Sequence, residues 1–208
     1  MNTQQELVDH LVHSGVLVTP RIIDAFRDVD RKDFVLSIYD ALEIYADHAL
    51  PIGYGQTISQ PFTVAFMCEI LQPRAGDHIL DVGSGSGWTT TLLAHIVGET
   101  GVVRGVEIIP ELVSFGAKNL AKYYHKNASI IQSSDAYGLP AYKPYDRILV
   151  SAAGTHIPQE LVDQLSDDGI LVMPVEHEII RYKKDGGDID RYEGFSFVPL
   201  INPSKNIL

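Results

Sequence analysis

The segment Ile79-Leu-Asp-Val-Gly-Ser-Gly-Ser-Gly87 decides the fold of this 208-residue chain. A short apolar run leads into Asp81, three glycines follow at alternate positions, and residues 88–97 then have the length and apolar pattern of a helix. Glycine suits the turn between them because it tolerates positive φ and lets a ligand lie against the backbone. This order predicts the opening strand–turn–helix unit of a Rossmann-like, doubly wound α/β fold.

The spacing of the glycines favours a ligand that carries no phosphate. Dinucleotide-binding proteins use G-x-G-x-x-G and rest the pyrophosphate on the N-terminus of the helix. Here the third glycine comes one residue early, and Asp81 lies two residues before Gly83, where its charge would repel a pyrophosphate. S-adenosylmethionine, which carries a sulfonium and an ammonium, suits this turn better. A nicotinamide-dependent oxidoreductase is therefore a weaker alternative, and a tight turn that binds no ligand is another.

Composition limits the other choices. With 208 residues, of which 45% are hydrophobic, the chain suits one domain with a sizeable core. No apolar run is long enough to span a bilayer and the N-terminus lacks a signal-peptide pattern, so we expect no membrane partner. Cys68 is the single cysteine, which favours a reducing cytoplasm. The net charge of −11 argues against a nucleic-acid partner. His10 and His13 share a helix face without a third ligand nearby, so no metal site is predicted.

Apolar periodicity predicts an N-terminal helical cap with an active-site loop over residues 1–60 and a Rossmann-like core over residues 61–208, together forming one domain. Alternating strands and helices in the core imply a mostly parallel sheet that is covered on both faces and ends in an antiparallel hairpin. Helices are expected at 3–14, from Pro20, within 34–46, at 62–71, at 88–97, from Pro110 and at 158–165. Strands are expected at 79–82, 101–107, 129–132, 145–153 and 169–174, with two extended runs around the turn 184–188, the last of which ends at 197–200.

The segment 49–61 permits two interpretations of Ser59. Pro51, Gly53 and Gly55 exclude a regular helix, and Ser59 directly precedes Gln60-Pro61 and the apolar-periodic run 62–71. Spacing alone favours Ser59 as the N-cap of that helix, with the proline in its first turn.

Two motifs together resemble the protein-L-isoaspartate O-methyltransferases, a family of class I methyltransferases. They are Gly53-Tyr-Gly-Gln-Thr-Ile-Ser-Gln-Pro61 and Leu80-Asp-Val-Gly-Ser-Gly-Ser-Gly87, and the resemblance extends over about residues 20–200. It implies S-adenosyl-L-methionine as the cofactor and methylation of the α-carboxylate of L-isoaspartyl residues in damaged proteins. The family's active-site residue is the serine of T-I-S-x-P, which falls on Ser59.

The expected cofactor contacts lie at the ends of successive predicted strands. Glu107 ends the strand 101–107, near the spacing of a carboxylate that accepts hydrogen bonds from ribose hydroxyls. In the resembled family a later Asp-Gly pair meets the adenine: Asp135 matches the acid, whereas Ala136 departs from the glycine. Ile201 departs from a polar residue with which some members contact the cofactor. The predicted cofactor-binding residues are Ile58, Asp81, Gly83, Ser84, Gly85, Gly87, Glu107, Ile108, Asp135 and Ala136.

The chemistry implied for Ser59 is orientation. A carboxylate is already ionised at neutral pH, so its methylation needs little acid–base catalysis and depends on alignment. No adjacent histidine would activate Ser59 as a nucleophile, so we expect it to donate a hydrogen bond to the substrate carboxylate. We therefore predict a monomeric protein-L-isoaspartate O-methyltransferase acting on isoaspartyl peptides and damaged proteins. The alternatives are a methyltransferase for another carboxylate or a small molecule, and a catalytically inactive cofactor-binding interaction module.

Overall fold

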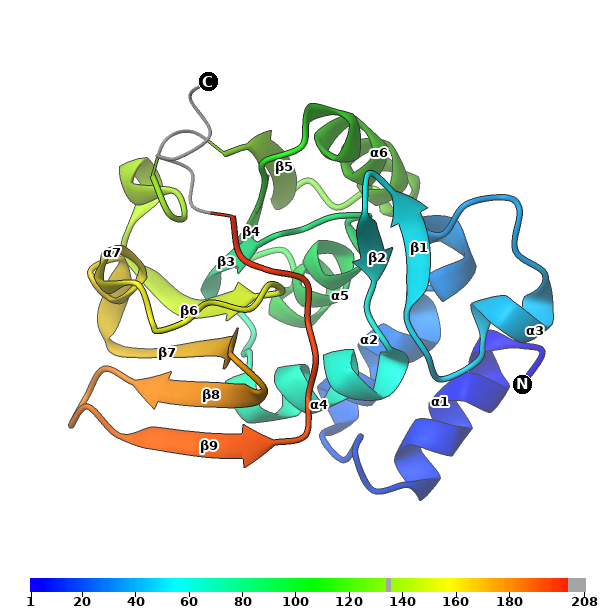
Figure 1. Cartoon of the computed structure of the whole chain (residues 1–208), viewed down its shortest axis with the longest axis horizontal. Helices are drawn as coiled ribbons and strands as arrows, with labels where there is room; N and C mark the ends of the chain where they lie inside the picture. Colours follow the sequence, from blue (N-terminus) through cyan, green and yellow to red (C-terminus); the bar gives the residue numbers. More distant parts are fainter. Residues whose placement is uncertain (134–135, 202–208) are drawn as a thin grey trace.

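A computed structural model describes residues 1–133 and 136–201 of the chain (Figure 1). Within them, seven strands form one sheet in the order β5-β4-β3-β6-β7-β8-β9. The parallel part consists of β3 (His78–Val82), β4 (Val102–Glu107), β5 (Ala128–Gln132), β6 (Tyr145–Val150) and β7 (Leu165–Val175). The antiparallel strands β8 (Glu178–Lys183) and β9 (Ile189–Glu193) follow in chain order at one edge. The predicted Rossmann-like sheet with a C-terminal hairpin is confirmed.

Helices cover both faces of this sheet, because neighbouring residues of a strand point to opposite sides. Ile79 of β3 packs in a core with α4 (Pro61–Leu71) and α5 (Trp88–Val97). Leu80, the next residue, packs in a separate core with α7 (Gln159–Val162) on the other face. The helix α6 (Pro110–Leu120) lies against α5 and β5, and the short helices η2 (Ala121–Tyr123) and η3 (Pro140–Tyr142) follow it in the chain. No helix in the described ranges is long and apolar enough to cross a membrane.

The N-terminal segment shares a hydrophobic core with α4 and α5. It contains α1 (Gln4–His13), α2 (Pro20–Asp28), η1 (Arg31–Phe34) and α3 (Ala41–Ile44). Phe26 of α2 meets Trp88, the first residue of α5, edge to face with 5.7 Å between ring centroids. Both side chains are fully or almost fully buried, so the cap is fixed directly against the helix that follows the glycines.

The segment expected as a loop contains a small hairpin, formed by β1 (Leu50–Gly53) and β2 (Gln56–Ile58). The sequence 49–61 has no clear alternation of apolar and polar residues, so its strands could not be predicted from periodicity. The turn depends on positive φ at Gly53 (92°), Tyr54 (55°) and Gly55 (70°). Glycine adopts this region readily and therefore allows the tight reversal.

The last strand is shorter than predicted, so its predicted end at 197–200 is wrong. The strand β9 ends at Glu193, and Gly194 has φ 94°, where the chain leaves the sheet. Residues 194–201, the carboxyl-terminal strap, then run across α4 towards the end of β6 (Figure 1). Ala153 pairs with the strap, donating from its amide to the carbonyl of Val198 and accepting from the amide of Leu200, both at 2.8 Å.

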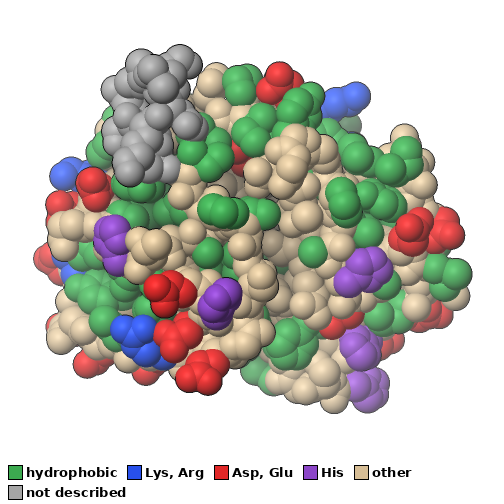
Figure 2. Space-filling model, viewed as in Figure 1, with side chains coloured by type: hydrophobic (Ala, Val, Ile, Leu, Met, Phe, Trp, Pro, Cys, Tyr) green, Lys and Arg blue, Asp and Glu red, His purple; other side chains and the backbone are tan. Residues whose placement is uncertain are grey.

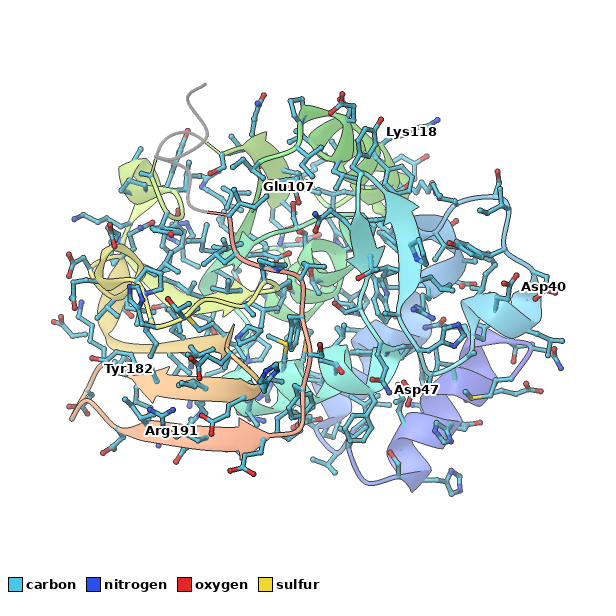
Figure 3. The ribbon with its side chains drawn as sticks, viewed as in Figure 1. Asp40, Asp47, Glu107, Lys118, Tyr182 and Arg191 are labelled. Atoms are coloured by element: carbon cyan, nitrogen blue, oxygen red, sulfur yellow. The ribbon has the colours of Figure 1, made fainter. Side chains whose placement is uncertain are left out.

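The interpretation of Ser59 as a helix cap is also wrong. The N-cap of α4 is Gln60, and its side chain makes no capping bond. The helix is capped from a distance instead, because Asp47 Oδ1 accepts a hydrogen bond of 2.8 Å from the amide of Phe62. Asp47 lies beside the start of α4 (Figure 3). Asp47 Oδ2 also accepts from Gln60 Nε2 at 3.2 Å. Since this distant carboxylate serves the helix, the hydroxyl of Ser59 is left for another role.

This capping arrangement predicts unequal losses of stability for two substitutions. Asp47→Ala should lower the free energy of unfolding by about 1–2 kcal/mol, because it leaves the Phe62 amide unpaired at a helix start. Ser59→Ala should change it by less than about 0.5 kcal/mol, as expected away from caps and cores. Urea unfolding of both variants beside the wild type measures the difference. An equal loss in the two variants would contradict the assignment of the cap.

Candidate active site

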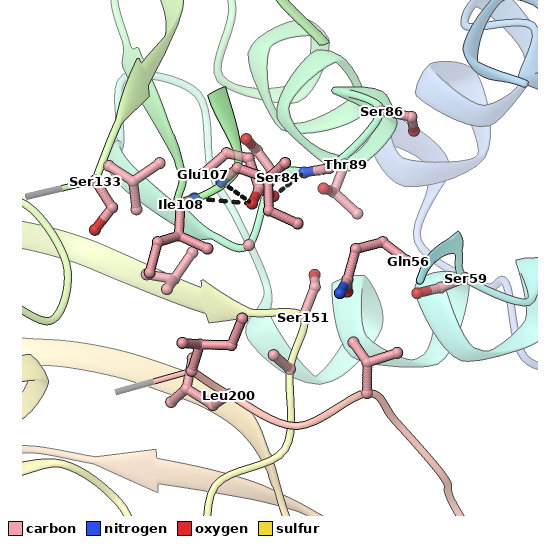
Figure 4. A pocket seen from close by; sticks show the side chains of 18 of the residues that line it. Gln56, Ser59, Ser84, Ser86, Thr89, Glu107, Ile108, Ser133, Ser151 and Leu200 are labelled. Carbon is pink, nitrogen blue, oxygen red and sulfur yellow. Dashed lines mark hydrogen bonds between the residues drawn. The ribbon is translucent and has the colours of Figure 1, made fainter. Parts of the chain in front are cut away.

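A cavity opens where the carboxyl ends of β3, β4 and β6 meet the hairpin β1–β2 and the carboxyl-terminal strap (Figure 4). Its empty space, including the open mouth, is about 920 Å³. This position, beside the strand at which the connections change direction, is where open α/β sheets bind ligands. On the face of the molecule that Figure 2 shows, charged side chains lie mainly towards the edges, whereas hydrophobic and uncharged polar groups occupy the middle.

The glycine turn, residues 83–87, is held by very close packing. Gly83, Gly85 and Gly87 all have positive φ, at 78°, 50° and 85°. A Cβ on Gly87 would lie 2.8 Å from the carbonyl oxygen of Gly116 in α6, which no real side chain tolerates. The third glycine therefore allows α5 and α6 to pack together, and it does not line the cavity.

Most backbone amides of the glycine turn are already used within the protein. Those of Gly83 and Ser84 donate to the carbonyl of Val106, at 2.9 and 3.1 Å, and that of Gly87 donates to Ser84. The amide of Gly85 donates to Glu107. A phosphate-binding loop needs such amides to be free for the anion. The arrangement therefore agrees with the sequence-based preference for a ligand without phosphate.

Glu107 ties the glycine turn to the end of β4. Its Oε2 accepts from the amide of Gly85 at 2.9 Å, and its Oε1 accepts from those of Ile108 and Ile109 at 2.8 and 3.0 Å (Figure 4). The side chain lines the cavity although the residue is only 6% exposed. It thus presents a fixed negative charge to a ligand and also holds the turn, a structural role that the sequence did not reveal.

Asp81 lies behind the turn and does not line the cavity. It is fully buried, and its Oδ2 accepts from the hydroxyls of Thr89 and Thr90 at 2.8 and 2.6 Å. Its Oδ1 has no partner within the described part of the chain. Burial raises the pKa of Asp81 to about 6, the two threonine hydroxyls oppose this, and the charge of Glu107 adds to it. Asp81 can therefore act on a ligand only through its field or through an intervening group.

Most of the other predicted residues meet at the cavity wall. The predicted residues that line it are Ile58, Ser59, Gly83, Ser84, Gly85, Glu107, Ile108 and Ala136. Asp135 lies outside the described residues. The carboxyl-terminal strap also contributes, through its apolar residues 198–201, so Ile201 borders the cavity although it replaces a polar residue.

Several polar residues at the cavity were not predicted, among them Gln56 and Ser151. The side chain of Gln56 projects from β2 into the space between Ser59 and Ser151, and Ser151 follows β6 on the opposite wall (Figure 4). None of these three side chains forms a hydrogen bond with another described residue, so all three remain available to a ligand. The position of Ser151, directly after a predicted central strand, was a usable signal.

The sheet order, the glycine turn with its carboxylates and the cavity beside them define the chain as a class I methyltransferase. The comparisons with known proteins agree and are more specific. The family model for protein-L-isoaspartate(D-aspartate) O-methyltransferase matches residues 2–205. The chain therefore belongs to the protein-L-isoaspartate(D-aspartate) O-methyltransferase family.

Individual relatives bear the same name. The protein-L-isoaspartate O-methyltransferase of Fervidobacterium nodosum is 42% identical over 178 residues, which cover 86% of this chain and 88% of the relative. That of Methanosarcina mazei is 40% identical, covering 90% of this chain and 79% of the relative. A Plasmodium falciparum structure, described as such an enzyme in complex with S-adenosyl-L-homocysteine, has a TM-score of 0.86 and 26% identity, covering 97% of this chain and all of its own.

The buried carboxyl of Asp81 predicts a pH-dependent difference in stability. Its folded pKa of about 6 exceeds the unfolded value, so the folded state binds more protons between about pH 4 and 6. The stability that protonated Asp81 contributes is therefore lost as the pH rises through about 6. The free energy of unfolding of Asp81→Asn minus that of the wild type should therefore rise by on the order of 2 kcal/mol as the pH goes from 4 to 7.

Chemical unfolding of both proteins at several pH values measures this difference. Groups shared by the two proteins cancel, so only Asp81 and groups coupled to it contribute to the difference. Parallel stability profiles across this range would show that Asp81 has an ordinary pKa in the folded protein.

Proposed function

We propose that this chain transfers a methyl group from S-adenosyl-L-methionine to the α-carboxylate of L-isoaspartyl residues in damaged proteins, the first step of their repair. The observation that carries the proposal is the position of Ser59. Its uncommitted hydroxyl belongs to the cavity wall opposite the glycine turn and Glu107 (Figure 4). One cavity thus offers a site for a cationic cofactor and a donor for an anionic substrate.

The residues at the glycine turn suit S-adenosyl-L-methionine, which supplies a methyl group on positively charged sulfur. Most amides of the glycine turn are occupied, and the nearby carboxylates of Asp81 and Glu107 favour a cation. Oε2 of Glu107 accepts from one backbone amide and keeps lone-pair capacity for a ribose hydroxyl, whereas Oε1 already accepts from two. Ile108 and Ala136 provide apolar wall for the adenine.

On the substrate side, Ser59 donates a hydrogen bond to one carboxylate oxygen and so directs the other towards the methyl group. Gln56 and Ser151 face the same space and can donate to the carboxylate or to the adjoining peptide group (Figure 4). No proton has to move before the attack, because the carboxylate is already ionised. Alignment is the protein's main contribution, and alignment can lower such a barrier by roughly 7–11 kcal/mol in favourable cases.

We propose further that the chain works as a single-domain monomer in the cytoplasm. The described residues that line the cavity all come from one chain, from the hairpin of the N-terminal segment to the carboxyl-terminal strap. The N-terminal cap shares a core with α4 and α5, which supports one domain. The single cysteine, Cys68, is buried and suits a reducing compartment. Sedimentation at working concentrations tests the monomer.

The test of the proposed reaction is methyl incorporation into paired peptides that differ only in an aspartyl or an isoaspartyl linkage. We expect incorporation into the isoaspartyl peptide alone. Equal methylation of both peptides, or of small carboxylic acids only, would favour a methyltransferase of another specificity. Cofactor binding without any methylation would favour an inactive interaction module.

Replacement of Glu107 by glutamine should weaken binding of S-adenosyl-L-homocysteine at least about tenfold, because charge-assisted hydrogen bonds contribute roughly 1.5–3 kcal/mol each. The side-chain amide of glutamine would also place its NH₂ group against a backbone N–H that donates to the carboxylate in the wild type, and two donors cannot pair. Titration calorimetry measures the dissociation constant. Glu99→Gln, an equal change in charge on the surface, is the control. An unchanged dissociation constant in folded Glu107→Gln would remove Glu107 from the cofactor site.

Ser59→Ala should lower kcat/KM for the isoaspartyl peptide at least about tenfold, equivalent to roughly 1.4 kcal/mol of transition-state stabilisation. Cofactor affinity and the thermal midpoint should stay near the wild-type values, because the hydroxyl bonds no other described residue and caps no helix. Steady-state kinetics beside calorimetry and thermal unfolding separate these effects. Near wild-type methylation would show that the family's serine does not act in this chain.

A further inference from the structure

Arg31 is the most deeply buried cation in the described part of the chain, and the reaction outlined above does not use it. It lies in η1, is 0% exposed, and follows the helix α2 of the N-terminal cap. Its guanidinium group forms no direct ion pair within 4 Å among the described residues. A buried charge without a close counter-ion is costly and needs compensating hydrogen bonds. These bonds indicate what the residue does.

The guanidinium group donates hydrogen bonds to the backbone of two separate segments. Nη1 donates to the carbonyls of Ile44 and Ala46, at 2.6 and 3.1 Å. Nη2 donates to the carbonyls of His48, at 2.8 Å, and Ser59, at 3.2 Å. One planar group therefore joins the segment after α3 to the residue that follows β2.

The same group lies directly behind the cavity wall. Its central carbon is 5.5 Å from the centroid of the Trp88 ring, within the range of a cation–π contact. Trp88 and Ser59 both line the cavity. Although burial lowers the pKa of Arg31 to about 10, with the nearby Asp47 opposing the effect, the group stays charged at neutral pH. Arg31 thus contacts the Trp88 ring of α5 and the backbone of Ser59 from the side away from the cavity.

Ser59 needs such support because its own side chain supplies none. Its hydroxyl makes no hydrogen bond to a described residue, so its direction depends on the backbone that carries it. That backbone is fixed on one side by Arg31, through the carbonyl of Ser59. On the other side it is fixed by Asp47, through Gln60 and Phe62.

We propose that Arg31 is a positioning residue for methyl transfer: by binding the Ser59 carbonyl and the backbone of residues 44–48, it aims the Ser59 hydroxyl at the substrate carboxylate. The inference rests on the proposed role of Ser59 in the reaction. Lysine cannot form the same set of hydrogen bonds, because its single ammonium, with three donors, replaces a planar guanidinium group that donates to carbonyls of two segments. Arg31→Lys keeps the charge, so it tests geometry separately from charge.

The experiment is a double-mutant cycle in the full chain, with kcat measured on an isoaspartyl peptide for the wild type, Arg31→Lys, Ser59→Ala and the double variant. We expect kcat to fall at least about fivefold in Arg31→Lys, while the dissociation constant for S-adenosyl-L-homocysteine stays within about twofold. In the Ser59→Ala background, Arg31→Lys should change kcat by less than about twofold, because the group that it positions is absent.

A matched control is Arg147→Lys. Arg147 is also buried, at 4% exposed, and it binds the carbonyl of Asp146 and faces Asp77 at 3.7 Å, but it does not line or touch the cavity wall. We expect it to lower the thermal midpoint and leave kcat unchanged. If Arg31→Lys does not fold, Asp47→Asn takes its place in the cycle, because Asp47 holds the other side of Ser59.

The outcomes separate the two proposals. Multiplicative losses in the double variant, or wild-type kcat in Arg31→Lys, would overturn the positioning role and leave the proposed function standing. Wild-type kcat in Ser59→Ala would overturn the role of Ser59 first. Loss of kcat in Arg31→Lys that vanishes without the Ser59 hydroxyl supports the inference.

Discussion

The central position of β3 between two parallel neighbours is the constraint on which this molecule depends. From β3 the chain crosses to β4 and β5 on one side, and later returns to β6 on the other. Because the connections diverge there, a crevice must remain at the carboxyl ends of these strands. The glycine turn leaves β3 at this point, Glu107 ends β4, and Ser151 follows β6. The topology alone thus brings distant parts of the sequence to one cavity.

Close packing gives the turn its shape, and internal hydrogen bonds decide what it can bind. The contact between Gly87 and Gly116 allows α5 and α6 to meet, while Glu107 and the carbonyl of Val106 occupy most of the turn's amides. An anion would find few free donors and two nearby carboxylates. The proposed preference for a cationic cofactor therefore rests both on amides that are already hydrogen-bonded and on carboxylates that are close by.

Charge is divided along the cavity in keeping with the two reactants. Asp81, behind the glycine turn, and Glu107, in the cavity wall, lie at the end that we propose for the positively charged cofactor. Arg31 lies behind Ser59, at the end that we propose for the substrate carboxylate. The chain as a whole carries a net charge of −11, so the buried arginine is a local exception that favours an anionic substrate. The carboxyl-terminal strap completes the apolar wall between these ends.

The sequence by itself determined the Rossmann-like fold, the glycine turn, Glu107 at a strand end and the serine of the T-I-S-Q-P motif, because these depend on periodicity and on residues close together in the chain. Only the tertiary structure decided that Asp47 caps α4, that Asp81 lies behind the turn, and that Arg31 clamps Ser59. The contacts of Asp47 and Arg31 join residues 15 and 28 positions apart in sequence, and no local pattern encodes them. Packing against the rest of the molecule chooses which carboxylate, amide or guanidinium group reaches a given backbone atom.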